Sequence, residues 1–236
     1  TAGIPEDTKA LSWGVFDFPD FVGQAHTVME ESQKLFDYEL SHFKEGMLFF
    51  YFSSIDQNHH ILWRTTDPTH PGYNSAEAGR FNDAIYQIYE VMDKTVGKAL
   101  EKIDFETTLI VMSDHGFAPY YRSFNLNTWL KNNGYVKFRG SPKPEELKYF
   151  NRVDWSRTAA YGVGLNGLYV NLRGREREGS VAPGKKRDEL IKELIEKLLA
   201  VRDPKNGEPV IQKIYRAEEI YSGPYVKDAP DLLIGY

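Results

Sequence analysis

The stretch TTLIVMSDHGF, residues 107–117, decides the fold class of this chain. Its first half, residues 107–112, is apolar and rich in β-branched side chains without alternation, which is typical of a strand covered on both faces of a parallel sheet. The run ends in a polar tip, residues 113–116. Ligands of such sheets bind beyond the carboxyl ends of the strands. Asp114 and His115 therefore lie where an active site is expected, and both are good ligands for a zinc-like ion.

A second stretch repeats this pattern. The apolar run MLFFYF, residues 47–52, leads into SSIDQNHH, residues 53–60. Asp56 and His60 are four residues apart, so they share one face if a helix begins after the strand. Two ligands on one face can grip one ion. His59 would then point elsewhere, as a pocket-lining or solvated side chain.

The segment between the two apolar runs predicts how they pair. Residues 76–102 have the apolar spacing of a long helix. Strand, helix and strand at this spacing form a βαβ unit with a right-handed crossover, which makes the strands parallel. The expected class is therefore α/β. Other helices are expected at 20–43 with Asp20 as N-cap, 125–133, 185–201 and 217–221, and short strands at 135–138, within 158–172, at 210–215 and at 231–235.

The remaining segments are predicted to be loops and turns that connect these elements. Residues 1–19 predict an irregular lead-in, 61–75 a loop, and 141–157 a loop with a helical piece, because turn residues punctuate them. Gly162, Gly164 and Gly167 predict a turn between two strands. The charged stretch from Arg173 to Arg177 predicts a solvated loop.

Composition excludes some classes of function. The formal charge of −5 argues against binding to a nucleic-acid duplex, and no apolar run approaches the roughly 20 residues of a membrane span. The chain has no cysteine, so disulfides and thiolate chemistry are absent, while the compartment and the oligomeric state stay open.

Each candidate site residue also has a plain structural interpretation. Asp114 can cap the following turn while His115 packs against the sheet. The second Asp and His pair favours the metal-site interpretation, because two strand ends that each carry such a pair are better explained by a two-metal site than by coincidence. Asp93 is interpreted as a surface or packing charge of its helix. The other polar and aromatic residues near the tips are interpreted as loop or packing residues, with substrate contact as the alternative: His70, Trp63, Tyr120, Tyr121 and Arg122.

The motifs SSIDQNHH (53–60) and LIVMSDHGF (109–117) resemble those of the type I phosphodiesterase / nucleotide pyrophosphatase family, within the alkaline phosphatase superfamily. The stretches at 164–181 and 229–236 are also similar to bacterial members of that family. The resemblance covers most of the chain from about residue 47 onward. It implies an alkaline-phosphatase-like fold, a three-layer αβα sandwich with a mostly parallel central sheet, present here in incomplete form.

The resemblance also implies a two-metal hydrolase that acts on a small-molecule phosphoester. The ions would be zinc, with manganese or magnesium as alternatives. Asp56 and His60 match the ligands of one ion, which takes a third ligand from a later His. Asp114 and His115 match ligands of the second ion, which also binds a strand-end Asp and a Thr or Ser nucleophile.

The chain departs from that pattern in two places. No segment before Asp56 matches the nucleophile region, and no His follows His115. We therefore assign no catalytic nucleophile, and we expect residues 1–236 to be a truncated single catalytic domain that is inactive alone and binds metal weakly or not at all. Two alternatives remain open: another reaction of the superfamily (phosphomonoesterase, sulfatase or phosphoglycerate mutase-like), or a non-catalytic scaffold with a decayed site.

Overall fold

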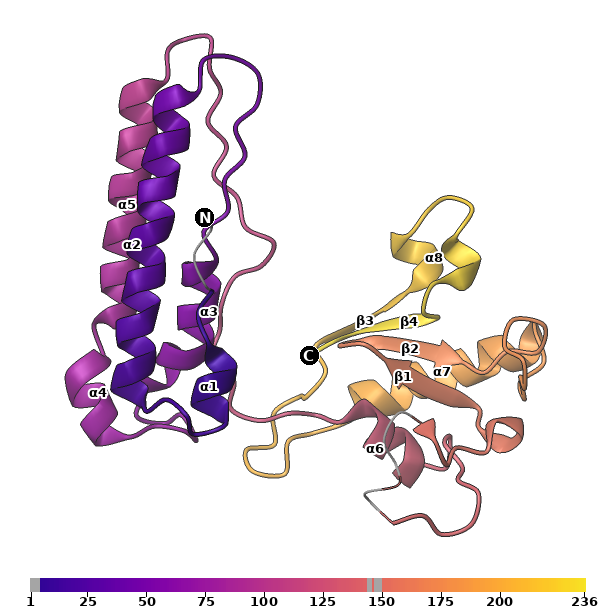
Figure 1. Ribbon diagram of the computed structural model, residues 1–236. Helices are drawn as coiled ribbons and strands as arrows, with labels where there is room; N and C mark the ends of the chain where they lie inside the picture. The colour runs from indigo at the N-terminus through magenta and orange to yellow at the C-terminus, as the bar shows by residue number, and fades with distance from the viewer. Residues whose placement is uncertain (1–4, 144–145, 147–149) are drawn as a thin grey trace. The chain divides into compact units, whose positions relative to one another are not determined.

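The computed structural model describes residues 5–143, 146 and 150–236, and the chain divides into two compact units at Arg122 and Ser123 (Figure 1). The first unit is helical in its regular structure, and the second combines helices with a small sheet. The expected α/β class is thus confirmed for the chain as a whole. Part of the loop predicted at 141–157 lies outside the described residues.

Helix α2 of the first unit begins with a reciprocal capping box. The side chain of Asp17 accepts a hydrogen bond from the backbone N–H of Asp20 at 2.8 Å, and Asp20 accepts one from Asp17. Asp17 is therefore the N-cap, and the prediction of Asp20 is wrong by one turn. The helices of this unit are α1 (Thr8–Ser12), α2 (Phe18–His42), α3 (Ser53–Leu62), the 3₁₀ helix η1 (Trp63–Thr65), α4 (Ser75–Phe81) and α5 (Ala84–Lys102).

The core of the first unit lies where α2, α3 and α5 pack together. Phe21, Leu62 and Ile88 are among its buried side chains. Two expectations are corrected here. The predicted lead-in contains the short helix α1, and the predicted long helix over 76–102 is interrupted between α4 and α5.

The two apolar runs are extended but are not strands of a sheet. No backbone hydrogen bond joins residues 47–51 or 108–112 to any other described residue. Met47 is 90% exposed and Ile110 is 72% exposed. The predicted parallel βαβ pair is therefore wrong for this structure, because apolar composition favours burial but does not supply the neighbouring strand that backbone groups need.

Residues 47–52 still show the alternation of a strand with one covered face. Side chains at 48, 50 and 52 are partly buried, whereas those at 47, 49 and 51 are exposed. The rings of Phe50 and Phe52 lie 5.2 and 5.5 Å from the ring of Phe36 on α2. Helix α2 thus covers one side of this segment.

The second unit follows the predicted order closely. Its helices and strands fall within a few residues of the expected positions, except that 135–138 forms no strand and only Phe138 makes an isolated bridge, to Val153. The elements are α6 (Leu126–Asn132), the 3₁₀ helix η3 (Trp155–Arg157), β1 (Ala160–Val163), β2 (Gly167–Val170), α7 (Lys185–Leu199), β3 (Lys213–Arg216), α8 (Ala217–Ile220), the 3₁₀ helix η4 (Val226–Asp228) and β4 (Leu232–Gly235).

The sheet has the order β1-β2-β4-β3, and each of these strand pairs is antiparallel. Strands β1 and β2 form a hairpin whose turn contains Gly164 at φ +71°, as the glycines predicted. The small sheet is therefore antiparallel rather than parallel. Helix α7 buries Ile191, Leu194 and Leu198 in one core with side chains of the sheet.

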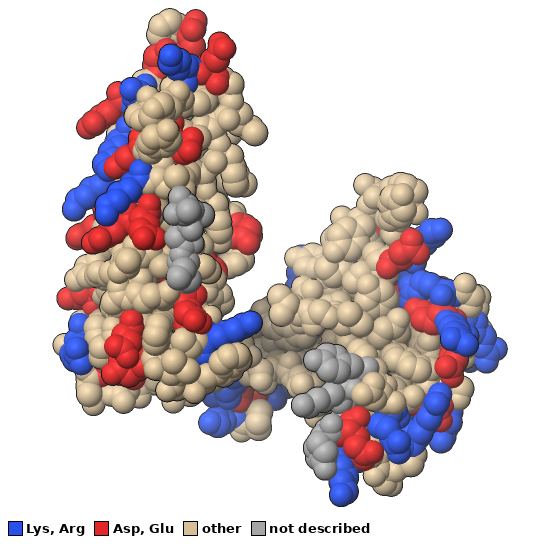
Figure 2. Space-filling view, in the orientation of Figure 1, with Lys and Arg blue, Asp and Glu red and all other residues tan. Residues whose placement is uncertain are grey.

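The surface carries both signs of charge. Figure 2 shows Lys and Arg side chains interspersed with Asp and Glu on the visible face of each unit. Among the described residues, no helix combines the length and apolar character needed for a membrane crossing.

Candidate functional site

Helix α3 places the first predicted ligand pair on one face. It begins at Ser53, directly after the apolar run, so Asp56 and His60 lie one turn apart. His60 Nε2 is 3.5 Å from Asp56 Oδ1. The predicted helical spacing of this pair is confirmed.

The tip that follows residue 112 brings the second pair to the same helix. His115 Nε2 lies 3.7 Å from Asp56 Oδ1 and 3.6 Å from Asp114 Oδ2. Asp56 is thus set between the imidazoles of His60 and His115, while Asp114 is at the exposed edge. The structure therefore gathers all four predicted residues into one cluster, which we call the Asp56 cluster.

The carboxylate of Asp56 is incompletely paired. Its Oδ2 accepts a hydrogen bond from Gln57 Nε2 at 3.1 Å. Its Oδ1 is buried and has no hydrogen-bond partner among the described residues, since both imidazoles lie beyond hydrogen-bonding range. A desolvated carboxylate oxygen without a donor is costly, so this atom is suited to a cation.

The tautomer of His115 also favours a cation at this position. Its Nδ1 lies 3.1 Å from the carbonyl oxygen of Gly116, and it is the ring nitrogen that donates a hydrogen to this carbonyl. In that tautomer Nε2 carries a lone pair and faces the oxygens of Asp56 and Asp114. Electron pairs that face one another are stabilised by a positive charge between them, so the arrangement is suited to a cation.

The fit of a metal ion is partial. Imidazole nitrogens and carboxylate oxygens are zinc ligands, and two ligands of one tetrahedral zinc ion lie about 3.3 Å apart. The spacings of 3.5 and 3.7 Å from Asp56 Oδ1 to the two imidazoles are close to that value. Within the described residues, however, no group of three or more His, Asp or Glu side chains is arranged to hold an ion. The cluster therefore offers ligand pairs rather than a complete coordination sphere.

An aromatic layer lies beneath the cluster. His59 is buried, and its ring packs against the rings of Trp63, Tyr89 and Phe117. His59 is thus an interior side chain, and the expectation of a solvated or pocket-lining residue is wrong. Trp63 likewise packs on Phe117 at a ring separation of 6.2 Å. No local sequence pattern marks Phe117 as a site residue, although it directly follows the predicted tip.

The first unit contains a second polar contact that joins distant segments. The hydroxyl of Tyr121 donates a hydrogen bond to Asp67, and this bond, with further ones from Thr69, holds the pKa of the Asp67 carboxyl below its usual value. The ring of His70 is 5.9 Å from that of Tyr121. The sequence marked Asp67 only as a turn residue, because nothing local signals a contact across 54 positions.

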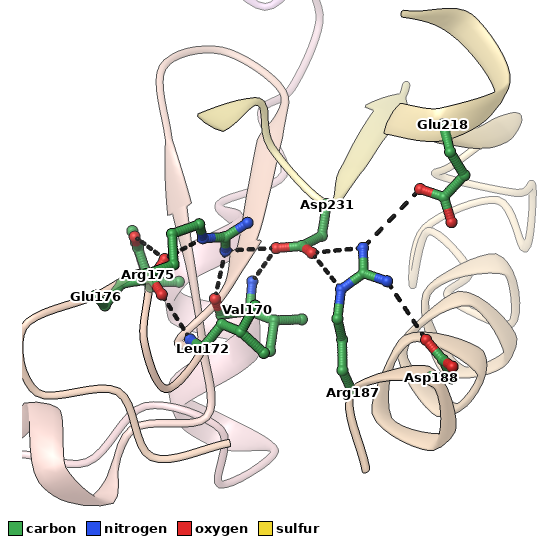
Figure 3. Close-up of polar contacts among 9 residues, drawn as sticks. Val170, Leu172, Arg175, Glu176, Arg187, Asp188, Glu218 and Asp231 are labelled. Carbon is green, nitrogen blue, oxygen red and sulfur yellow. Dashed lines mark hydrogen bonds and ion pairs between the residues drawn. The ribbon is translucent and has the colours of Figure 1, made fainter. Parts of the chain in front are cut away.

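Asp231 is a buried charge of the second unit with several close partners (Figure 3). Its Oδ2 accepts hydrogen bonds from Val170 N–H at 2.8 Å and Arg175 Nη2 at 2.7 Å, and its Oδ1 accepts from Arg187 Nε at 2.8 Å. Arg175 is largely buried by these contacts, so the prediction of a fully solvated loop at 173–177 is wrong for this residue. We call these residues the Asp231 network.

The comparisons with known proteins bear on the whole chain. No curated protein and no solved structure matches it. The model of one family, type I phosphodiesterase / nucleotide pyrophosphatase, matches residues 8–235. That span contains both halves of the Asp56 cluster and begins well before residue 47, where the motif resemblance starts. This chain therefore belongs to the type I phosphodiesterase / nucleotide pyrophosphatase family.

Proposed function

We propose that this protein is a metal-dependent phosphoric ester hydrolase, and that Asp56, His60, Asp114 and His115 are its metal ligands. Membership of a phosphodiesterase and nucleotide pyrophosphatase family supports the reaction class. The observation that carries the ligand assignment is the approach of His115 Nε2 to Asp56 Oδ1 at 3.7 Å. Two motifs that are far apart in the sequence, each able to bind a metal, meet at one carboxylate.

The proposed cofactor is a pair of divalent ions. Mixed imidazole and carboxylate donors favour zinc, with manganese or magnesium as alternatives. When bound, such ions polarise phosphoryl oxygens and activate a hydroxyl nucleophile. In this chain, Asp56 supplies a buried carboxylate oxygen, and His60 and His115 supply imidazole nitrogens. The attacking hydroxyl is assigned to no residue of this sequence.

We also propose that the two units belong to one alkaline-phosphatase-like catalytic domain with the αβα sandwich architecture. Two observations support this. The family match crosses the boundary at Arg122 without interruption. Residues 47–52 alternate between covered and exposed side chains, as a strand does when one of its faces is covered.

Zinc binding by the chain tests the ligand assignment. We expect weak binding in equilibrium dialysis that is lost in both Asp56→Asn and Asp114→Asn, because each variant replaces an anionic ligand by a neutral amide. Asp37→Asn is the matched control, since Asp37 lies in an exposed ion pair on α2. Binding that survives in both site variants would contradict the assignment.

Substrate chemistry is tested with chromogenic esters. We expect no hydrolysis of bis(4-nitrophenyl) phosphate without zinc and at most slow hydrolysis with it, because no nucleophile is assigned in this chain. Comparison with 4-nitrophenyl phosphate and 4-nitrophenyl sulfate separates diester, monoester and sulfate chemistry. A chain that neither binds zinc nor hydrolyses any of the three esters would favour the non-catalytic scaffold.

A further inference from the structure

The ring of Phe117 contacts both candidate ligand pairs. Its centroid lies 4.9 Å from the ring of His60 and 5.6 Å from the ring of His115. It also lies 4.8 Å from the ring of His59 and stacks on Trp63 with an interplanar angle of 20°. One apolar side chain therefore joins α3 and η1 to the tip that carries Asp114 and His115.

Phe117 is also the point where this segment becomes anchored. Every residue from 104 to 116 is exposed, and Phe117 is the first that is partly buried. The carboxylate of Asp114 and the imidazole of His115 are part of that exposed stretch. Their approach to α3 therefore depends on contacts made by the residue that follows the tip.

The ring geometry suits orientation rather than ligation. Phe117 meets His60 at 78° and His115 at 63°, so it presents edge-to-face contacts to both imidazoles. A phenyl ring neither donates nor accepts a conventional hydrogen bond, so it restrains the imidazoles without occupying their nitrogens. Ligating histidines are usually oriented by a hydrogen bond from their second nitrogen, and here packing adds to the one that His115 makes.

We infer that Phe117 is a positioning residue that holds the 113–116 tip against α3 and thereby sets the spacing between His115 and Asp56. This inference rests on the proposed function, because the spacing matters only if the two residues share a ligand. Replacing the ring leaves all four candidate ligands in the sequence but frees the tip that carries two of them.

The test is cobalt binding to the full chain, followed by the visible absorption of the bound ion. For Phe117→Leu we expect at least about tenfold weaker binding, in line with losses seen when the groups that orient metal ligands are removed, and a changed spectrum. Phe117→Tyr keeps the ring and is expected to bind cobalt within about threefold of wild type. If Phe117→Leu does not fold, Phe117→Met replaces it, because methionine fills irregular apolar sites.

Phe81→Leu is the control for a loss of stability alone. Phe81 packs on Phe18 at 5.3 Å in the core of the same unit, and no ring contact joins it to a candidate ligand among the described residues. We expect it to lower the free energy of unfolding without changing cobalt affinity. Equal affinity in Phe117→Leu and wild type would overturn the inference while leaving the proposed function intact. Failure of wild type itself to bind cobalt would overturn both.

Discussion

Asp231 in the second unit and Asp56 in the first are both carboxylates flanked by two basic side chains, but their pairing differs. Asp231 has a side chain that is 0% exposed, and its partners Arg175, Arg187 and Val170 all lie at 2.7–2.8 Å. Asp56 is 25% exposed, and its two imidazoles stand at 3.5 and 3.7 Å. Both oxygens of the Asp231 carboxylate accept hydrogen bonds from the protein, whereas Oδ1 of Asp56 accepts none among the described residues.

This difference separates a structural charge from a candidate binding charge. A buried ion whose acceptor sites are all filled has no capacity left for a ligand, so its role is to hold β4, the loop after β2 and α7 together. A desolvated oxygen without a donor is kept at a cost to stability, and such costs concentrate at functional sites.

The largest effect is expected for Asp231→Asn. The amide keeps the volume but removes the charge, leaving the largely covered guanidinium groups of Arg175 and Arg187 beside a neutral group. Removing one partner of a buried ion pair costs about 3–5 kcal/mol. Urea denaturation of the chain, followed by a signal from the unfolding of the second unit, should show a decrease of this size in the free energy of unfolding.

Glu218→Gln is the control for this measurement. Glu218 also approaches Arg187, but at 3.9 Å and with a half-exposed side chain. Exposed pairs contribute at most about 1 kcal/mol, so the variant should unfold much like wild type. If Asp231→Asn cost no more than Glu218→Gln, the network would not be the structural element that its geometry indicates.

Asp56→Asn should give the opposite result. Removing a charge whose buried Oδ1 has no donor among the described residues should leave the free energy of unfolding within about 1 kcal/mol of wild type, or raise it. Zinc affinity should fall by about 100-fold, which corresponds to about 2.7 kcal/mol of binding free energy. Calorimetry and urea denaturation on the same sample measure both quantities. A large loss of stability with unchanged zinc binding would show that Asp56, like Asp231, is a structural charge rather than a metal ligand.

A smaller effect is expected at high pH on the edge of the Asp231 network. Burial raises the pKa of Tyr161 to about 12, and the nearby Glu176 carboxylate adds to the shift. Glu176 also accepts a hydrogen bond from Arg175 at 2.8 Å. Because the folded pKa exceeds the unfolded value of about 10, the stability contributed by the neutral phenol is complete below pH 10 and is lost as pH rises through 12.

The measurement is urea denaturation at several pH values from 9 to 12. Wild type should lose up to about 2 kcal/mol more than Tyr161→Phe over this range, since the variant has no phenol to ionise. Other tyrosines titrate in both proteins and cancel in the difference. Parallel curves for the two proteins would show that Tyr161 is not linked to folding through its charge.

The fold was predictable where one segment carries its own pattern. The apolar stripes of α2 and α7 and the glycine hairpin between β1 and β2 are local features, and the structure has them within a few residues. The predicted pairing of 47–52 with 107–112 was wrong, because an apolar run shows a tendency to be buried but does not specify the segment that covers it.

The site shows the same limit. The approach of Asp56 and His60 follows from helical spacing, and the sequence identified all four residues of the Asp56 cluster. The prediction was that parallel strand ends bring them together, whereas the structure has Asp56 and His60 on α3 and the ring of Phe117 in contact with His60 and His115. Phe117 and Asp231 were missed because their roles come from contacts between distant segments.

The smallest effect is expected for Asp37→Asn. This variant tests whether the contact distance of a carboxylate or its burial determines its contribution to stability. Asp37 Oδ2 lies 2.6 Å from Lys98 Nζ, closer than any partner of Asp231, yet the two side chains are 44% and 47% exposed. Water and salt screen such a pair, so the variant should lose less than about 0.5 kcal/mol in urea denaturation, and 1 M salt should abolish the difference. A loss comparable to that of Asp231→Asn would mean that contact distance, rather than burial with full pairing, determines which carboxylates hold this fold together.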